Sequence, residues 1–182
     1  YSIHLEHLGD LATEIRKIGL LLGKVQQAEK QANDFQSTLN HMQKAHSHKR
    51  KITVFYQLWR KPLMTINHQT MIHEMIELCG GENIFSDVKT SYPAVNWETI
   101  VKKNPSIILV NDLSSIDYWK QFLFLTAVYH HQIYAIPSDI LQRESPRMLE
   151  GLKKICFILD QGRNHYCDTT TNAGRINRSC NK

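Results

Sequence analysis

Short apolar segments alternate with amphipathic segments after residue 51, and this alternation constrains the fold more than any other feature. Residues 52–58 are β-branched and aromatic, which predicts a strand, and residues 106–110 are continuously apolar, as in strands buried on both faces. Residues 70–78 have helical spacing and precede Gly80 and Gly81, which are typical of a helix end. Strand–helix alternation of this kind predicts an α/β fold with a parallel sheet.

The remaining segments continue the alternation. We expect helices at 96–103 and 117–128, a strand at 132–136, and a last helix opened by Ser145 as its cap and Pro146 in its first turn. The last helix carries one apolar stripe, made of Met148, Leu149, Leu152, Ile155, Cys156 and Leu159.

The chain before residue 51 has the periodicity of helix alone. Apolar residues from Leu8 to Met42 recur at steps of three and four, while Gly19 and Gly23 interrupt the pattern. We expect a short helix, a break near Gly23 and a longer helix to about Lys44, which at ~1.5 Å per residue is ~30 Å long. The pattern predicts a helical strut over residues 5–46.

Length and composition exclude several classes of protein. The 182 residues suit one domain, and with 42% apolar and 21% charged residues the chain is neither disordered nor fibrous. No apolar run approaches the roughly 18 residues of a membrane span. The chain begins with Tyr1 and no signal segment opens it, so we interpret it as a processed form or a piece of a longer chain.

The net charge of +5 is concentrated in the C-terminal tail. Residues 161–182 contain four basic residues and one acidic residue, and they lack an apolar period. We therefore expect them to be disordered, to lie outside the fold and to contribute no ligand contact.

A second basic cluster precedes residue 52. It consists of Lys44, Lys49, Arg50 and Lys51, with His41, His46 and His48 between them. A solvated helix end explains it best, because the helix dipole favours cations there; nucleic-acid or anion binding is the alternative. We expect no nucleic-acid partner.

No motif marks a cofactor, a metal or a nucleophile. The sequence lacks a glycine-rich phosphate loop, HExxH, CxxC and GxSxG. His68 with His73, and His130 with His131, are the closest histidine pairs, but neither spacing places two imidazoles on one helical face. We expect no metal and no cofactor, and the four cysteines allow one bridge with two left over.

Three segments together resemble the second lobe of the periplasmic substrate-binding proteins for cobalamin, haem and iron–siderophores. They are residues 54–85 with Gly80-Gly81-Glu82-Asn83, residues 92–110 with Tyr92-Pro93 and Asn104-Pro105, and residues 136–149 with Ser145-Pro146-Arg147. The resemblance covers about residues 8–160, and it is strongest to the cobalamin-binding members.

The resemblance implies an interlobe helical segment at 1–50, a C-terminal α/β lobe at 51–160 and a non-family tail at 161–182. It implies a monomer that is no enzyme, captures cobalamin in the periplasm and delivers it to the permease of an ABC importer. An iron–siderophore or haem ligand is the alternative within the family. A chelatase-like tetrapyrrole enzyme, for which His68 is the nearest histidine, is the alternative from another class. Because the first lobe of the family has no counterpart here, we expect this chain alone to bind ligand weakly.

The resemblance also assigns roles to single residues. It implies a disulfide between Cys79 and Cys156, with two buried thiols as the alternative. It also places eight residues at the ligand cleft: Trp59, Arg60, Tyr92, Asp139, Ile140, Leu141, Gln142 and Arg143. Ile140 stands where the family has an aromatic residue. Core or rim packing for the aromatics and solvation for the arginines are the simpler interpretations. For docking on the permease it implies Asp117, with Asp112 second, although an Asp at a helix start is also a common cap.

Overall fold

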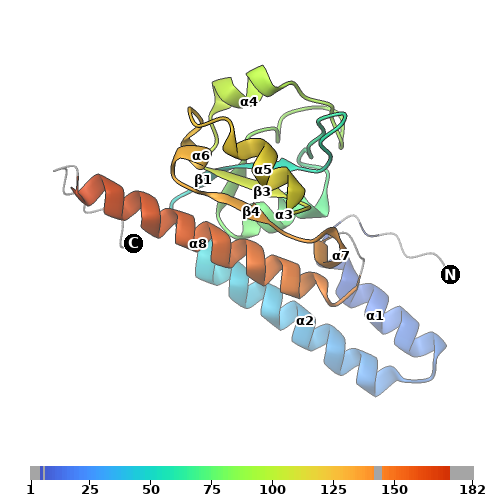
Figure 1. Ribbon diagram of the computed structural model, residues 1–182. Helices are drawn as coiled ribbons and strands as arrows, with labels where there is room; N and C mark the ends of the chain where they lie inside the picture. Colours follow the sequence, from blue (N-terminus) through green and yellow to red (C-terminus); the bar gives the residue numbers. More distant parts are fainter. Residues whose placement is uncertain (1–4, 6, 142–144, 173–182) are drawn as a thin grey trace.

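A computed structural model describes residues 5, 7–141 and 145–172, with side chains to residue 167. The chain forms a helical hairpin followed by one α/β lobe (Figure 1). The elements are α1 Asp10–Leu21, α2 Val25–His46, β1 Ile52–Gln57, α3 Met71–Leu78, β2 Gly81–Asn83, α4 Trp97–Lys103, β3 Ile107–Val110, α5 Ser114–Lys120, α6 Thr126–Tyr129, β4 Ile133–Ala135, α7 Ser138–Leu141 and α8 Met148–Asn172.

The four strands form one parallel sheet in the order β2-β1-β3-β4, which confirms the predicted fold class. Side chains alternate between its faces: Val54 and Tyr56 of β1 enter one core, and Phe55 enters the other. All four residues of β3 are buried, because helices cover both faces. This explains why the strand is continuously apolar rather than alternating.

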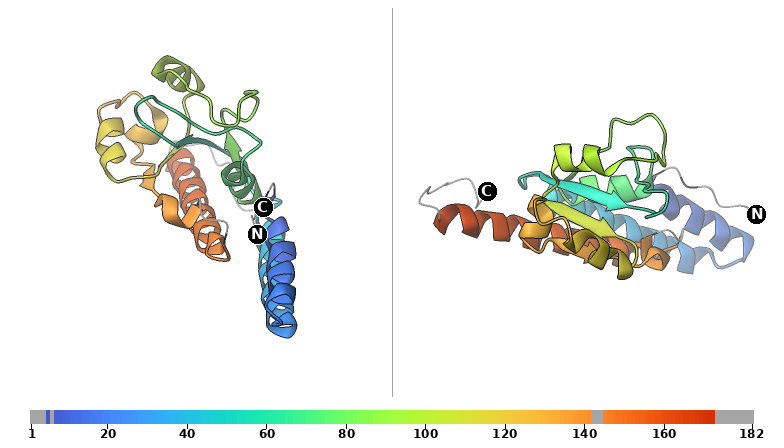
Figure 2. Two further views of the ribbon diagram at one scale, coloured as in Figure 1. Left: turned by 90° about the vertical axis from the view of Figure 1, so that its right-hand side faces the viewer. Right: turned by 45° about the horizontal axis from the view of Figure 1, so that its top comes forward.

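Two layers of helices enclose the sheet (Figures 1 and 2). On one face, α2, α3 and α8 pack through residues such as Leu39, Met75 and Ile155. On the other face, α4, α5 and α6 contribute Ile100 and Trp119, among others. The two faces therefore hold two separate hydrophobic cores.

The N-terminal helices fold back on each other instead of forming one strut. The predicted break is confirmed at Gly23, whose φ of +66° turns the chain, and α1 lies along α2 (Figure 1). The helices touch so closely at Gly19 that an added Cβ would lie 2.0 Å from Cβ of Ala28. The strut predicted over residues 5–46 is thus a hairpin, of which the C-terminal half of α2 packs on the lobe. Its tip is apolar and exposed, at Leu20, Leu21, Leu22 and Val25.

Two local expectations need correction, and one strand was not expected. The helix expected at 117–128 is two helices, α5 and α6, because the chain between them turns to bury Leu125 and to pack Phe122 against Trp119. The strand β2 has no sequence signal, since three residues without apolar alternation form it. Ser145 does not cap α8: the helix begins at Met148, and Ser145 Oγ has no hydrogen-bond partner within the described residues.

The tail prediction is wrong for the first part of residues 161–182. Helix α8 continues to Asn172, and Gly162 and Arg163 are buried. Gly162 fits against Ile52 and Ile107 at the base of the sheet, where an added Cβ would come within 2.6 Å of Ile107. The helix docks there through a glycine and polar groups, so no apolar period marks it. Residues 173–182 lie outside the described part of the chain.

The end of α8 contacts the chain immediately before each of the four strands. Arg163 Nε donates to the carbonyl of Arg50 before β1 (2.8 Å), and its Nη2 donates to the carbonyl of Cys79 before β2. Tyr166 Oη donates to the carbonyl of Ser106 before β3 (2.8 Å), and His165 meets His130 before β4 (3.1 Å between ring nitrogens). The last turns of α8 therefore close the amino edge of the sheet.

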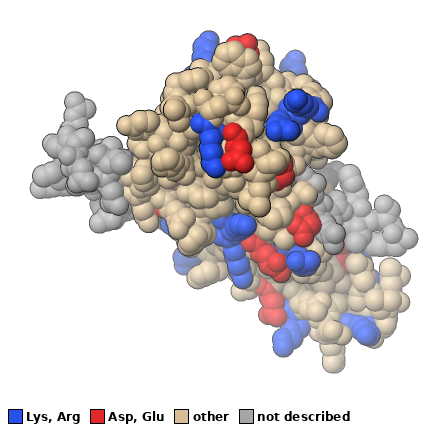
Figure 3. Space-filling view, in the orientation of Figure 1, with Lys and Arg blue, Asp and Glu red and all other residues tan. Residues whose placement is uncertain are grey.

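The basic cluster before β1 is only partly solvated. His46 is buried, Lys49 binds Asp160 of α8 at 2.7 Å, and Lys51 binds Glu77 of α3 at 2.7 Å. On the face shown in Figure 3, acidic and basic side chains are interspersed. The interpretation as a solvated helix end is thus wrong for His46 and Lys49, whereas Lys51 is exposed and pairs with Glu77 at the surface.

No helix in the described ranges has the length and apolar character needed to cross a membrane.

Candidate functional site

Trp59 lies just after β1, at the carboxyl edge of the sheet. It is part of a loop that is closed by backbone hydrogen bonds. Met64 N donates to the carbonyl of Trp59 (2.9 Å), and Leu58 N donates to the carbonyl of Met64 (2.9 Å). Thr65 Oγ1 adds a bond to the carbonyl of Tyr56 (2.6 Å). Trp59 is 60% exposed, yet the backbone of its loop is held by these hydrogen bonds.

A second segment, with Tyr92, is tied to this loop. Val95 N donates to the carbonyl of Leu63 (2.9 Å), and Thr65 N donates to the carbonyl of Pro93 (3.0 Å). Tyr92 itself is 53% exposed. The two aromatic side chains are thus fixed on one surface while their rings remain available.

Between them is an apolar hollow of about 590 Å³. It is open to solvent, and Leu141 of α7 is one of the residues that line it. Its lining residues are Leu58, Trp59, Pro62, Met64, Thr70, Met71, Ile72, Tyr92 and Leu141. The structure therefore brings together Trp59, Tyr92 and Leu141 from the set expected at the cleft. We call this surface the apolar hollow.

A polar hollow of about 820 Å³ adjoins it and shares Thr70, Met71 and Tyr92. Its other lining residues are Leu5, His7, His68, Gln69, His73, Glu74, Glu77 and Ser91. Burial lowers the pKa of His73, against the opposing charge of Glu77, so the neutral imidazole is favoured there.

Sequence reasoning missed most of this polar hollow. Glu74 is tied to the N-terminal segment: its Oε2 accepts from Leu8 N (2.9 Å) and lies 3.8 Å from His7 Nδ1. The spacing of Glu74 and Glu77 on α3, three residues apart, was the available signal. No three histidine, cysteine, aspartate or glutamate side chains in the described residues are grouped to hold a metal ion.

Other residues expected at the cleft lie elsewhere. Arg60 lines neither hollow; its guanidinium carbon is 5.9 Å from the ring centroid of Tyr118 on α5. Asp139 is exposed, and Ile140 packs on the core. Gln142 and Arg143 lie outside the described residues.

The two aspartates expected to dock on a permease differ in setting. The helix after β3 begins at Ser114, so Asp117 lies in its first turn rather than at its start. Asp117 pairs with Lys120 (2.8 Å), and 79% of the Asp117 side chain is exposed. Asp112 accepts from Ser115 N (2.9 Å) and Ser115 Oγ (2.7 Å). Hydrogen bonds from Ser114 and Ser115 hold the pKa of Asp112 below its usual value. Asp112 therefore serves as the cap, and Asp117 is the more available carboxylate.

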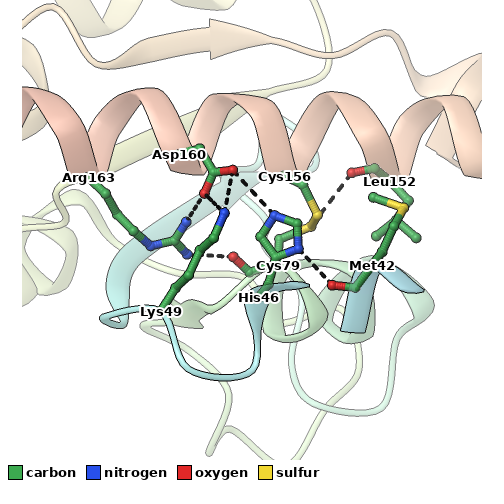
Figure 4. The surroundings of a disulfide bond; sticks show 8 residues. All are labelled: Met42, His46, Lys49, Cys79, Leu152, Cys156, Asp160 and Arg163. Atoms are coloured by element: carbon green, nitrogen blue, oxygen red, sulfur yellow. Dashed lines mark hydrogen bonds and ion pairs between the residues drawn. A yellow bond between two sulfur atoms is a disulfide. The ribbon is translucent and has the colours of Figure 1, made fainter. Parts of the chain in front are cut away.

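Cys79 and Cys156 are bridged, as the resemblance implied, with a Cα–Cα separation of 4.7 Å (Figure 4). The bond joins the end of α3 to α8 beside Asp160, which binds Lys49, Arg163 and His46. Burial raises the pKa of Asp160, but the hydrogen bond and charge of Lys49, with His46 and Arg163, outweigh it and lower the pKa. The bridge and the ion cluster together fix α8 to α2 and α3.

A parallel-sheet lobe with an open apolar surface at its carboxyl edge is the architecture of a ligand-binding lobe. The family model for periplasmic binding proteins matches residues 5–140, and the chain belongs to this family.

Similar proteins bind vitamin B12 or carry an iron-related name. The chain is 29% identical to the vitamin B12-binding protein of Vibrio cholerae over 162 residues, which is 87% of this chain and 59% of that protein. The crystal structure of the periplasmic vitamin B12-binding protein BtuF of Vibrio cholerae matches with a TM-score of 0.83 at 28% identity, over 90% of this chain and 65% of that one. A possible iron-binding protein of Staphylococcus epidermidis matches with a TM-score of 0.76 at 25% identity, over 86% and 64%. The chain thus spans less than two thirds of the length of these relatives.

Proposed function

We propose that this chain provides one lobe of a periplasmic substrate-binding protein that captures cobalamin for an ABC importer. The observation that carries the proposal is the apolar hollow at the carboxyl edge, with Trp59 and Tyr92 exposed on a fixed backbone. The similarity to vitamin B12-binding proteins over most of the chain supports the choice of ligand.

The chemistry of the surface suits a large chelate with a broad apolar face. Aromatic rings provide planar contact area, and fixing them beforehand lowers the entropic cost of binding. The polar hollow beside it offers the imidazoles and carboxylates of His68, His73 and Glu77 to the amide groups at the edge of such a ligand. The apolar hollow is open, so a second wall is needed to enclose the ligand.

The exposed apolar tip of the hairpin, at Leu20, Leu21, Leu22 and Val25, supports a two-lobe arrangement. Exposed apolar side chains in one patch are unusual on a finished surface and are typical of an interface. We expect the opposite lobe to lie against this side of the molecule.

The remaining roles belong to the same proposal. The protein acts in the periplasm as a monomer, and the exposed carboxylate of Asp117 contacts the permease. Its activity is binding and not catalysis, as in the family, which argues against a tetrapyrrole chelatase working through His68. A siderophore or haem ligand is the alternative, and the iron-related name of one relative supports it.

Calorimetry with cobalamin, on this chain and on a chain extended by an upstream lobe, tests the proposal. We expect weak or no binding by this chain and tight binding by the extended one. Sub-micromolar affinity of this chain alone, about −8 kcal/mol or better, would contradict the two-lobe mechanism. An extended protein that ignores cobalamin but takes up haem or a ferric siderophore would keep the fold assignment and reject the ligand.

A further inference from the structure

Two histidines far apart in sequence meet at the amino edge of the sheet. His130 caps the end of α6, before β4, and His165 lies on the last turns of α8. His130 Nδ1 and His165 Nε2 are 3.1 Å apart, and both side chains are half-buried. This pair is remote from the carboxyl edge, so the proposed ligand site does not use it.

We propose that His130 and His165 together bind a divalent transition-metal ion. Two nitrogen ligands at about 2.0–2.1 Å from one metal are about 2.9 Å apart at a right angle and about 3.3 Å apart at the tetrahedral angle. The observed 3.1 Å lies between these values. Rotation of the rings about their second side-chain torsions, which are broad for histidine, would direct both lone pairs at one ion.

The backbone on both sides holds the two rings at this separation. His130 N donates to the carbonyl of Thr126 (3.1 Å), and the carbonyl of His130 accepts from Gln132 Nε2 (3.1 Å). On α8, the neighbouring Tyr166 is bonded to the carbonyl of Ser106, and its ring packs against His130 at 5.1 Å between centroids. The ligands are thus positioned before the metal arrives.

The donor set indicates which ions fit. Imidazole nitrogens suit Cu²⁺, Ni²⁺ and Zn²⁺, and affinity rises from Co²⁺ through Ni²⁺ to Cu²⁺. No third histidine, cysteine or carboxylate joins the pair within the described residues. In the neutral pair one ring nitrogen donates its proton to the other. When the ion binds, this proton moves to the second nitrogen of the same ring, so both imidazoles stay neutral and each offers one lone pair. The bound metal would clip the end of α8 to the turn before β4.

Nickel titration of the full chain tests the site. By calorimetry we expect one Ni²⁺ per chain. His130→Gln and His165→Gln should each weaken binding at least about tenfold, whereas Mg²⁺, which prefers oxygen ligands, should not bind. His131→Gln is the matched control, because His131 is adjacent and exposed. Equal loss in this control, or less than about a twofold loss in both pair variants, would overturn the proposal.

Thermal melting gives a second measurement, independent of the heat of binding. At a Ni²⁺ concentration about 100-fold above the dissociation constant, the melting temperature of the wild type should rise by about 5 °C, because the metal binds the folded chain. The rise should disappear in His130→Gln and in His165→Gln and persist in His131→Gln. A pair that serves only as a hydrogen bond would show no rise in the wild type, which would also overturn the proposal.

Discussion

The two edges of the sheet are built in opposite ways. At the amino edge, the end of α8 bonds to the chain before every strand, and a disulfide and the Asp160 cluster lie beside it. At the carboxyl edge, Trp59 and Tyr92 are more than half exposed around a hollow of about 590 Å³. One edge is closed by polar contacts to the backbone, whereas the other presents apolar area to solvent.

We expect this difference to separate stability from the proposed ligand binding. Buried hydrogen bonds and ion pairs at the amino edge are costly to break, so changes there should lower the free energy of unfolding. Side chains at the carboxyl edge are exposed in this chain, so changes there should alter ligand affinity and leave stability nearly unchanged. A variant that did the reverse would show that the division is wrong.

Arg163→Met should have the largest effect. It removes one of the three partners of Asp160 and leaves the carbonyls of Arg50 and Cys79 without the charged donor that binds them. We expect a loss of about 3–5 kcal/mol in the free energy of unfolding, or about 10 °C in melting temperature. Lys49→Met is the matched control, because Lys49 also binds Asp160 but is 34% exposed. Denaturant unfolding measures both variants. Equal losses in the two variants would mean that the burial of Arg163 does not determine how much this edge contributes to the free energy of unfolding.

Replacing Cys79 and Cys156 by serine should come next. The bridge closes a separation of 77 residues, and its loss should lower the free energy of unfolding by about 2–5 kcal/mol. Cobalamin affinity of an extended protein should change far less, since the bridge is at the amino edge. Calorimetry beside chemical denaturation checks both halves of the expectation; a large loss of affinity in a folded variant would link the two edges.

Trp59→Ala tests the other edge. In an extended protein it should weaken cobalamin binding about tenfold, because in the proposed site the indole would supply much of the apolar contact, while the melting temperature moves little. Trp97→Ala is the control: Trp97 is similarly exposed, at 47%, but stacks on Phe122 beside the other core. Similar affinity in the two variants would place the ligand elsewhere.

Acid should weaken the amino edge selectively. The folded-state pKa of Asp160 is lowered, so its contribution is present above the unfolded pKa, near 3.9, and is lost as pH falls through the folded value. Comparing wild type with Asp160→Asn should therefore show a difference of about 1 kcal/mol at pH 7, given the 34% exposure of the side chain, and a smaller one near pH 2.5. A difference that grows in acid would contradict the assigned sign.

The sequence by itself predicted the local elements with strong periodicity. A run of apolar residues predicted strand β3, and glycines predicted the break at Gly23 and the end of α3 before Gly80. These predictions hold because each depends on only a few neighbouring residues of the chain. The resemblance predicted the Cys79–Cys156 bridge, which the structure contains. It also predicted that Trp59 and Tyr92 lie at one cleft, and both residues line the apolar hollow. Composition could not predict either, because only family motifs mark positions in a known fold.

Only the tertiary structure decided how distant segments meet. Arg163 reaches Cys79 across 84 positions, and His130 pairs with His165 rather than with its neighbour His131. The prediction of a disordered tail was wrong for the end of α8. This end of the helix packs through a glycine and through hydrogen bonds from side chains to carbonyls, so its sequence shows no apolar periodicity. Periodicity records burial of apolar side chains along one element, whereas polar contacts between elements depend on where the fold places both partners.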